Sequence, residues 1–282
     1  MADEIRREAV ATGQLDNEFR GRVSSGLPIA PLCELRSLIA TVDVPCWASG
    51  TTAAALHGFD GFRLKAPFHL TIERGHNLRR IGHAIHTTNT LELIDRAWAH
   101  GIPVLSPSRA LLHVAATETL AETVVALDSA VRDGLTTDDF LHRRLSKLRT
   151  SGRNGVRPLL AALETNEIIR GGHSWLEREF LRLAAKDGLP RPLTQQVLGR
   201  RGTTLIRVDA RFPDSPLVVE LLGYRWHRTV GQMMVDAQRM NRLQLAGFLV
   251  LQFTYSEVVD RPDEVIGVVR EALGSTLVST KT

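Results

Sequence analysis

The sequence predicts an α/β protein, α+β overall, with a mixed sheet flanked by helices in a C-terminal domain and a smaller, mainly helical α+β domain before it. The 282 residues exceed one ordinary domain, and hydrophobic residues make up 43% of them. From residue 173 onward the patterns read helix, strands, helix, strand, helix, which is typical of an α/β sandwich. The segment 150–158, rich in glycine and arginine, is the best linker candidate, so the predicted domains are residues 1–150 and 158–275.

In the N-terminal domain, residues 1–45 are expected to be mostly helical. The segments "FHLTIERG" and "IGHAIHTT" alternate apolar and polar residues, which predicts two strands. In "GIPVLSPSRALLHVAA" a short strand precedes a helix, with Ser106 as N-cap and Pro107 at the first helical position. Further helices are predicted at 119–133, 137–149 and 158–166.

In the C-terminal domain, Leu176, Phe180 and Leu183 fall at helical spacing behind Ser174, which predicts a helix that ends near Gly188. Two strands, "TTLIRVDARF" and "PLVVELLGY", follow and are joined by "PDSP". A helix is predicted at 229–246, then a strand "FLVLQFTY" and a last helix from Pro262.

Charge is spread unevenly along the chain. Residues 143–242 carry 19 Lys and Arg against 9 Asp and Glu, a net charge of +10, although the whole chain carries +4. A basic segment of this kind suits a polyanionic partner, because contacts to phosphates release counterions. We therefore expect a nucleic-acid partner, with DNA favoured; the alternative is an arginine-rich surface without such a partner, since only 4 of the 35 basic residues are lysines.

The remaining composition narrows the class of protein further. Two cysteines form no disulfide framework, and no apolar run reaches the ~20 residues that span a bilayer. The charged N-terminus lacks the apolar stretch of a signal peptide. A cytoplasmic protein without a membrane partner is expected. Phosphate-binding loops of the G-x-x-x-x-G-K type and G-x-S-x-G elbows do not occur, and His69, His76, His83 and His86 lack the spacing of zinc ligands.

Two carboxylates suggest a site. Asp209 lies between Arg207 and Arg211 on one face of its predicted strand, and Glu220 interrupts the apolar run of the next. If these strands form a hairpin, the two carboxylates converge, and a cation or shared proton must offset their repulsion. Hard oxygen ligands of this kind suit Mg²⁺ or Mn²⁺. His227 lies seven residues after Glu220 and is a candidate for proton transfer.

Residues 170–275 resemble the PD-(D/E)XK nuclease superfamily, in particular the branch related to very-short-patch-repair endonucleases. The resemblance rests on Glu177 in a helix, Asp209, the run "ELLGYRWH", and a closing helix with Asp236, Arg239 and Asn241. It implies a restriction-endonuclease-like fold and a metal-dependent endonuclease, with metal on Asp209 and Glu220. The implied catalytic residues are Glu177, Asp209, Glu220 and His227, the implied nucleic-acid contacts are Arg207, Arg211, Arg225 and Arg228, and Gln195, Asp236 and Arg239 would support the site.

One position departs from that family. The superfamily places a lysine two residues after the glutamate, and relatives in this branch place an acidic residue there, whereas this chain has Leu222. A cationic group would then come from His227, Arg225 or Arg207. The alternative is a catalytically inactive nuclease-fold protein that acts as a nucleic-acid-binding or antitoxin-like regulatory module.

Each candidate residue also has a purely structural interpretation. Ser174 and Glu177 match a helix capping box, and Asp209 matches a strand-face ion pair with Arg207 or Arg211. His227 matches a histidine at the edge of a core, and Asp236 with Arg239 matches a surface pair along a helix.

The N-terminal half resembles abortive-infection-type antitoxin domains. The segments that carry this weaker resemblance are "SGTTAAALHGFDG" and "GIPVLSPSRALLHVAA". It implies an antitoxin-like N-terminal region ahead of the nuclease-like domain.

Overall fold

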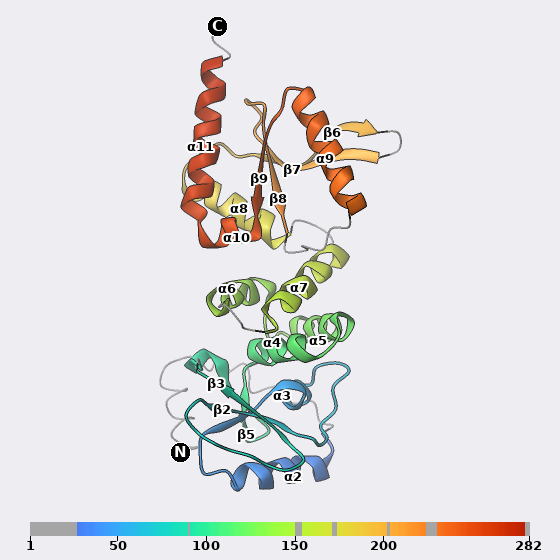
Figure 1. Cartoon of the computed structure of the whole chain (residues 1–282), viewed down its shortest axis with the longest axis vertical. Helices are drawn as coiled ribbons and strands as arrows, with labels where there is room; N and C mark the ends of the chain where they lie inside the picture. Colours follow the sequence, from blue (N-terminus) through green and yellow to red (C-terminus); the bar gives the residue numbers. More distant parts are fainter. Residues whose placement is uncertain are drawn as a thin grey trace. The chain divides into compact units, whose positions relative to one another are not determined.

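The computed structural model describes residues 27–89, 91–149, 154–170, 174–201, 204–223 and 230–279. The chain divides into two compact units, residues 1–166 and 167–282, and Figure 1 shows the elements of each. The boundary lies inside helix α7 (Val156–Arg170), which begins within the segment predicted as a linker. Among the described residues, no helix is both long and apolar enough to cross a bilayer.

The N-terminal unit is built on a five-stranded mixed sheet with the order β3-β2-β1-β5-β4. β2 pairs parallel with β3 and antiparallel with β1, while β5 pairs parallel with β1 and antiparallel with β4. The two strands predicted from alternation are confirmed as β2 and β3, and the short one as β5. The bounds of the strands are β1 Cys46–Ala48, β2 His69–Glu73, β3 Ala84–Thr88, β4 Arg96–Ala99 and β5 Ile102–Leu105.

The helices of this unit begin and end at the signals that the sequence carries. Pro107 opens α4 behind Ser106, and Thr119 caps α5 in a capping box with Glu122. Gly58, in the left-handed conformation at φ 75°, ends α3. The helix bounds are α2 Ile29–Ala40, α3 Gly50–His57, α4 Pro107–Thr117, α5 Leu120–Arg132 and α6 Asp138–Leu148, with a short 3₁₀ helix at Leu93–Asp95.

The C-terminal unit is a four-stranded mixed sheet with the order β6-β7-β8-β9. The first three strands pair antiparallel, and β8 pairs parallel with β9. The strand β6 is absent from the sequence-based prediction, which placed only Gln195 ahead of the aspartate strand. The bounds are β6 Leu193–Arg201, β7 Thr204–Arg211, β8 Leu217–Leu222 and β9 Leu249–Thr254.

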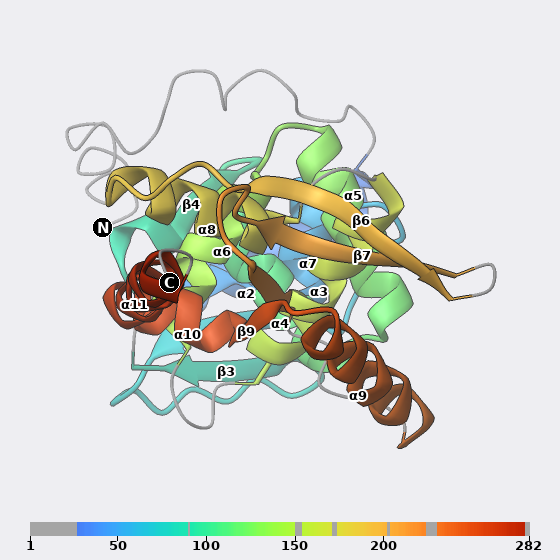
Figure 2. The same cartoon turned by 90° about the horizontal axis from the view of Figure 1, so that it is seen from above.

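Helices cover both sides of this sheet, as the sequence predicts. Helix α9 lies on one side, and α11 lies on the other together with α8 and α10 (Figure 1, Figure 2). Leu243 of α9 packs with Val208 and Val218, while Phe180 of α8 is fully buried. The helix bounds are α8 Trp175–Lys186, α9 Val230–Leu245, α10 Tyr255–Asp260 and α11 Pro262–Ser279. The mixed sheets flanked by helices confirm the predicted α+β class. The N-terminal unit was predicted to be the smaller one, but it is the longer of the two, residues 1–166 against 167–282.

Candidate functional site

The two carboxylates that the sequence singles out lie opposite each other in the C-terminal sheet. β7 and β8 pair at Ala210–Val219 and Arg211–Val218, so one step further along this register sets Asp209 against Glu220. Residues directly opposite in an antiparallel pair share a face of the sheet. The two carboxylates are near enough for the charge of Asp209 to raise the pKa of Glu220.

The pairs between β7 and β8 end at Ala210, and the next residue of β7, Asp209, bonds the backbone of β8 through its side chain. Its Oδ2 accepts a hydrogen bond from the backbone N–H of Leu221 at 2.7 Å. This hydrogen bond differs from the purely structural interpretation of Asp209, which was an ion pair with Arg207 or Arg211 on the same strand. Arg207 is exposed, and the Arg211 guanidinium lies over the Phe248 ring, 5.7 Å from its centroid.

A third carboxylate comes from the first turn of α8. The Ser174 hydroxyl accepts a hydrogen bond from the Glu177 backbone N–H at 3.2 Å, as an N-cap should. The Glu177 carboxylate is buried and accepts a hydrogen bond from Gln195 Nε2 at 2.7 Å. The helix start thus positions Glu177, and its carboxylate is near enough to Asp209 for its charge to raise the pKa of that group.

Gln195 connects the helix to the sheet. It falls between the pairs Thr194–Ala210 and Gln196–Val208, hence opposite Asp209 on β6. Its φ of 53° is left-handed, a conformation that costs a residue other than glycine free energy and that gathers at functional sites. The sequence named Gln195 as a supporting residue, but neither its strand nor its strained backbone was visible in the residue pattern.

Glu220 pairs with an arginine of the closing helix. One guanidinium nitrogen of Arg239 lies 2.8 Å and 2.9 Å from the two carboxylate oxygens, and it also donates to the Arg207 carbonyl. Glu220 is only 4% exposed. Among the described residues, Arg239 supplies a cationic group beside Glu220. Of the three candidates named from the sequence, Arg207 is exposed, and Arg225 and His227 lie outside the described residues.

Burial and mutual repulsion perturb the titration of this group of acids. Burial, and then the charge of Asp209, raise the pKa of Glu220 to about 7, against the opposing effect of Arg239. Burial also raises the pKa of Asp209, and the charge of Glu177 acts in the same direction. Carboxylates perturbed together by burial and by one another are typical of functional sites.

The raised pKa of Glu220 predicts a specific dependence of stability on pH. Below pH 4.5 the carboxyl is protonated in both folded and unfolded chains; between 4.5 and about 7 only the folded chain keeps the proton. The free energy of unfolding should therefore fall as pH rises across this window, by on the order of 3 kcal/mol from this group. Urea titrations from pH 5 to pH 8 measure the fall, and in the Glu220→Gln variant it should be much smaller. An equal fall in both proteins would exclude Glu220 as its source.

The remaining predicted residues divide into two groups. Asp236 is partly buried on α9, and it lies near the site because its charge raises the pKa of Glu220. The alternative was a surface pair of Asp236 with Arg239, but Arg239 pairs with Glu220. His227, Arg225 and Arg228 lie outside the described residues. Across the described part of the chain, no three His, Cys, Asp or Glu side chains come close enough together to hold a metal ion.

Comparisons with known proteins place the chain beside mycobacterial sequences. No family model matches it. It is 26% identical over 255 residues to an uncharacterized protein of Mycobacterium tuberculosis, found in the CDC 1551 / Oshkosh and H37Rv strains, with 88% of this chain and 90% of the relative covered. The crystal structure of the RV2827C protein from Mycobacterium tuberculosis aligns with a TM-score of 0.36 and 21% identity, over 49% of this chain and 54% of that chain. The aligned region thus spans about half the length of that protein.

Proposed function

We propose that the C-terminal unit is the hydrolytic module of a metal-dependent endonuclease-like protein that cleaves phosphodiester bonds, with DNA as its substrate. The observation that carries this proposal is the closeness of Asp209 to Glu220, whose pKa its charge raises, with Glu177 near enough for its charge to raise the pKa of Asp209. These acids come from one helix and two adjoining strands, and the charge of Asp209 in turn raises the pKa of Glu220. The likeness to nucleases noted in the sequence requires this arrangement.

The donor set fits Mg²⁺ or Mn²⁺. Both ions prefer carboxylate oxygens, and Mg²⁺ is commonly held by only one or two carboxylates, with water and substrate phosphates completing its coordination. The pKa of each of the two opposed carboxyls is raised, which marks a place where added positive charge would be stabilising. Asp209 and Glu220 would hold the ion, which, when bound, lowers the pKa of a water molecule and stabilises charge on a phosphoryl oxygen.

The surrounding residues have distinct proposed tasks. Gln195 orients the Glu177 carboxylate through its hydrogen bond, and Arg239 keeps a positive charge beside Glu220. The exposed Arg207 and Arg242 lie on β7 and α9, the elements that also carry Asp209 and Arg239, and suit contacts with the phosphate backbone. Arg225, Arg228 and Arg211 are further candidates for such contacts, and His227 for proton transfer.

A second candidate function is a non-catalytic nucleic-acid-binding or antitoxin-like regulatory module. The ion pair between Glu220 and Arg239 favours it, because Arg239 supplies the positive charge that a metal ion would bring. Leu222, at the position where the nuclease family has a lysine or an acid, favours it as well.

Incubation with DNA separates the two candidates. The full chain and supercoiled plasmid are incubated in Mg²⁺, in Mn²⁺ or in EDTA, and gel shifts with duplex DNA are recorded at two salt concentrations. We expect nicked or linear plasmid with either metal only, and an affinity that falls as salt rises. Salt-sensitive binding without cleavage would support the regulatory module instead, and DNA that is neither bound nor cut would contradict both functions.

A further inference from the structure

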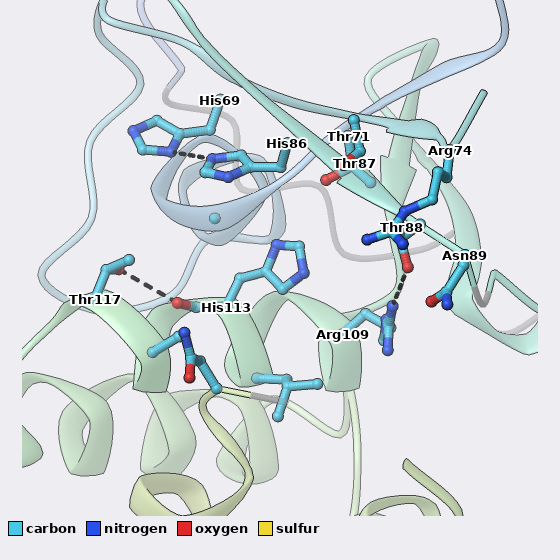
Figure 3. A pocket seen from close by; sticks show the side chains of 14 residues that line it. His69, Thr71, Arg74, His86, Thr87, Thr88, Asn89, Arg109, His113 and Thr117 are labelled. Atoms are coloured by element: carbon cyan, nitrogen blue, oxygen red, sulfur yellow. Dashed lines mark hydrogen bonds between the residues drawn. The ribbon is translucent and has the colours of Figure 1, made fainter. Parts of the chain in front are cut away.

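A pocket of about 500 Å³ lies within the N-terminal unit, between the sheet and helix α4 (Figure 3). Residues of β2, β3 and α4 line most of the pocket, and Gly50, at the start of α3, and Asn154 line the rest. This volume falls within the range of ~300–1,000 Å³ that is typical of sites for small molecules. All of its lining residues belong to one unit, so the pocket is independent of the carboxylate site on the C-terminal sheet.

The sheet contributes a polar wall because of strand register. β2 and β3 run parallel with Thr71 beside His86, so His69 and Thr71 share a face with His86 and Thr88. A row of polar side chains on one face of a sheet commonly faces solvent. In this unit the row faces helix α4, with the pocket between them. The helix presents Arg109, Leu112, His113, Ala116 and Thr117, which recur at helical spacing.

One end of the pocket carries positive charge. Figure 3 shows the side chains of Arg74, Thr88, Asn89 and Arg109 together at this end. Arg109 is only 2% exposed; its guanidinium lies 3.4 Å from the Thr88 hydroxyl and 3.8 Å from the buried Asp95 carboxylate. The described lining residues include two arginines and no carboxylate. Arginines paired with hydroxyl and amide groups suit the oxygens of a phosphate.

The other end is formed by imidazole rings. His69 Nδ1 and His86 Nε2 share a hydrogen bond at 3.1 Å with the rings stacked, and the His113 ring lies 6.1 Å from that of His86. Burial lowers the pKa of His69 and of His86, so both are neutral at physiological pH. Neutral imidazoles offer donors, acceptors and flat faces, which match the edge and plane of a heteroaromatic ring.

A threonine between the two ends of the pocket has a buried hydroxyl without a hydrogen-bond partner among the described residues. Thr71 lines the pocket and is fully buried, and its hydroxyl has no hydrogen-bond partner among the described residues. A buried polar group without a partner is destabilising, so the hydroxyl is available to a ligand.

We infer that this pocket binds a nucleoside monophosphate, with the phosphate at the arginine end and the base at the histidine end. The Thr71 hydroxyl then bonds the ligand between them. A planar ring with one anionic group matches the two ends together, whereas a simple anion would leave the histidine end unused.

Isothermal titration calorimetry on the full chain tests this inference. AMP, GMP, CMP, UMP, the free nucleosides and inorganic phosphate are titrated in EDTA, which keeps metal ions away from Asp209 and Glu220. At least one monophosphate should bind at least about 10-fold more tightly than both its nucleoside and inorganic phosphate, because each end contributes separately. Absence of binding by all four monophosphates, or equal affinity for inorganic phosphate, would overturn the inference.

Variants locate the binding on the full chain. Arg74→Gln and Thr71→Val should each weaken binding of the monophosphate, Arg74→Gln by at least about 10-fold, since it removes a charged hydrogen bond. Arg79→Gln is the matched control, because Arg79 is exposed, follows the same strand and lies outside the pocket lining. Its affinity should equal that of the wild type. Unchanged affinity in Arg74→Gln and Thr71→Val would place the ligand elsewhere, and circular dichroism confirms that each variant is folded. Because Glu220 takes no part, failure here leaves the proposed nuclease activity untouched.

Discussion

Replacing Glu220 by glutamine, or Asp209 by asparagine, is expected to lower metal-dependent plasmid cleavage by at least about 100-fold. Loss of a residue that merely orients a metal ligand costs ~10–100-fold, and loss of a ligand charge should cost at least as much. Both substitutions keep the size of the side chain. The amide oxygen at position 220 can still accept from Arg239, and the one at 209 from the Leu221 N–H, so the fold should persist.

Initial rates of loss of supercoiled plasmid, measured at saturating Mg²⁺ or Mn²⁺, give the size of the effect. Glu179→Gln provides the control, because Glu179 lies on the same helix as Glu177 and is bonded to Arg182. Metal binding has its own readout: Mn²⁺ should raise the melting temperature of the wild type and of Glu179→Gln more than that of Glu220→Gln. Cleavage by Glu220→Gln within a few-fold of the wild-type rate would remove this carboxylate from the mechanism.

Replacing Arg144 by methionine is expected to destabilise the N-terminal unit by about 3–5 kcal/mol, the range found when one partner of a buried ion pair is removed. Arg144 is 4% exposed and donates to both oxygens of Asp95, at 3.1 Å and 2.7 Å, and to Glu92. Asp95 is fully buried. Without Arg144, the cation that remains beside Asp95 in the described part of the chain is Arg109, at 3.8 Å, and such a contact is too long to replace two hydrogen bonds.

Urea unfolding followed by tryptophan fluorescence measures this loss, and hydrogen exchange of β1 and β2 assigns it to the N-terminal unit. Arg132→Met is the matched control, since Arg132 also bridges two carboxylates, Asp60 and Asp133, but is 53% exposed. The midpoint of urea unfolding of the Arg132→Met variant should be close to that of the wild type. If both variants shifted the transition equally, burial would not be the reason for the effect at Arg144. The double variant Arg144→Met with Asp95→Leu should recover part of the stability, because Asp95 is no longer buried without Arg144. The recovery should be incomplete, because the buried Arg109 loses its contact with Asp95 at the same time.

Local patterns were sufficient for much of the fold. Alternation predicted β2 and β3, and capping residues predicted the starts of α4 and α8, since these signals depend on neighbours within a few residues. β1, β4 and β6 were missed. β1 is three residues long and β4 is four residues long, and both are too short for a periodic signal. The register of β6 with β7 shifts between Val197 and Gly199, so β6 does not follow one regular alternation along its length.

The sequence by itself determined that Asp209 and Glu220 would meet, because a short connection between two strands leaves few registers and alternation assigns each side chain to a face. Only the tertiary structure decided that Arg239 pairs with Glu220, that Gln195 adopts a left-handed backbone opposite Asp209, and that three histidines and two arginines enclose one pocket. Those contacts join elements far apart in the chain. They depend on how helices pack on sheets, a geometry set by the whole core and not encoded in the spacing of any one segment.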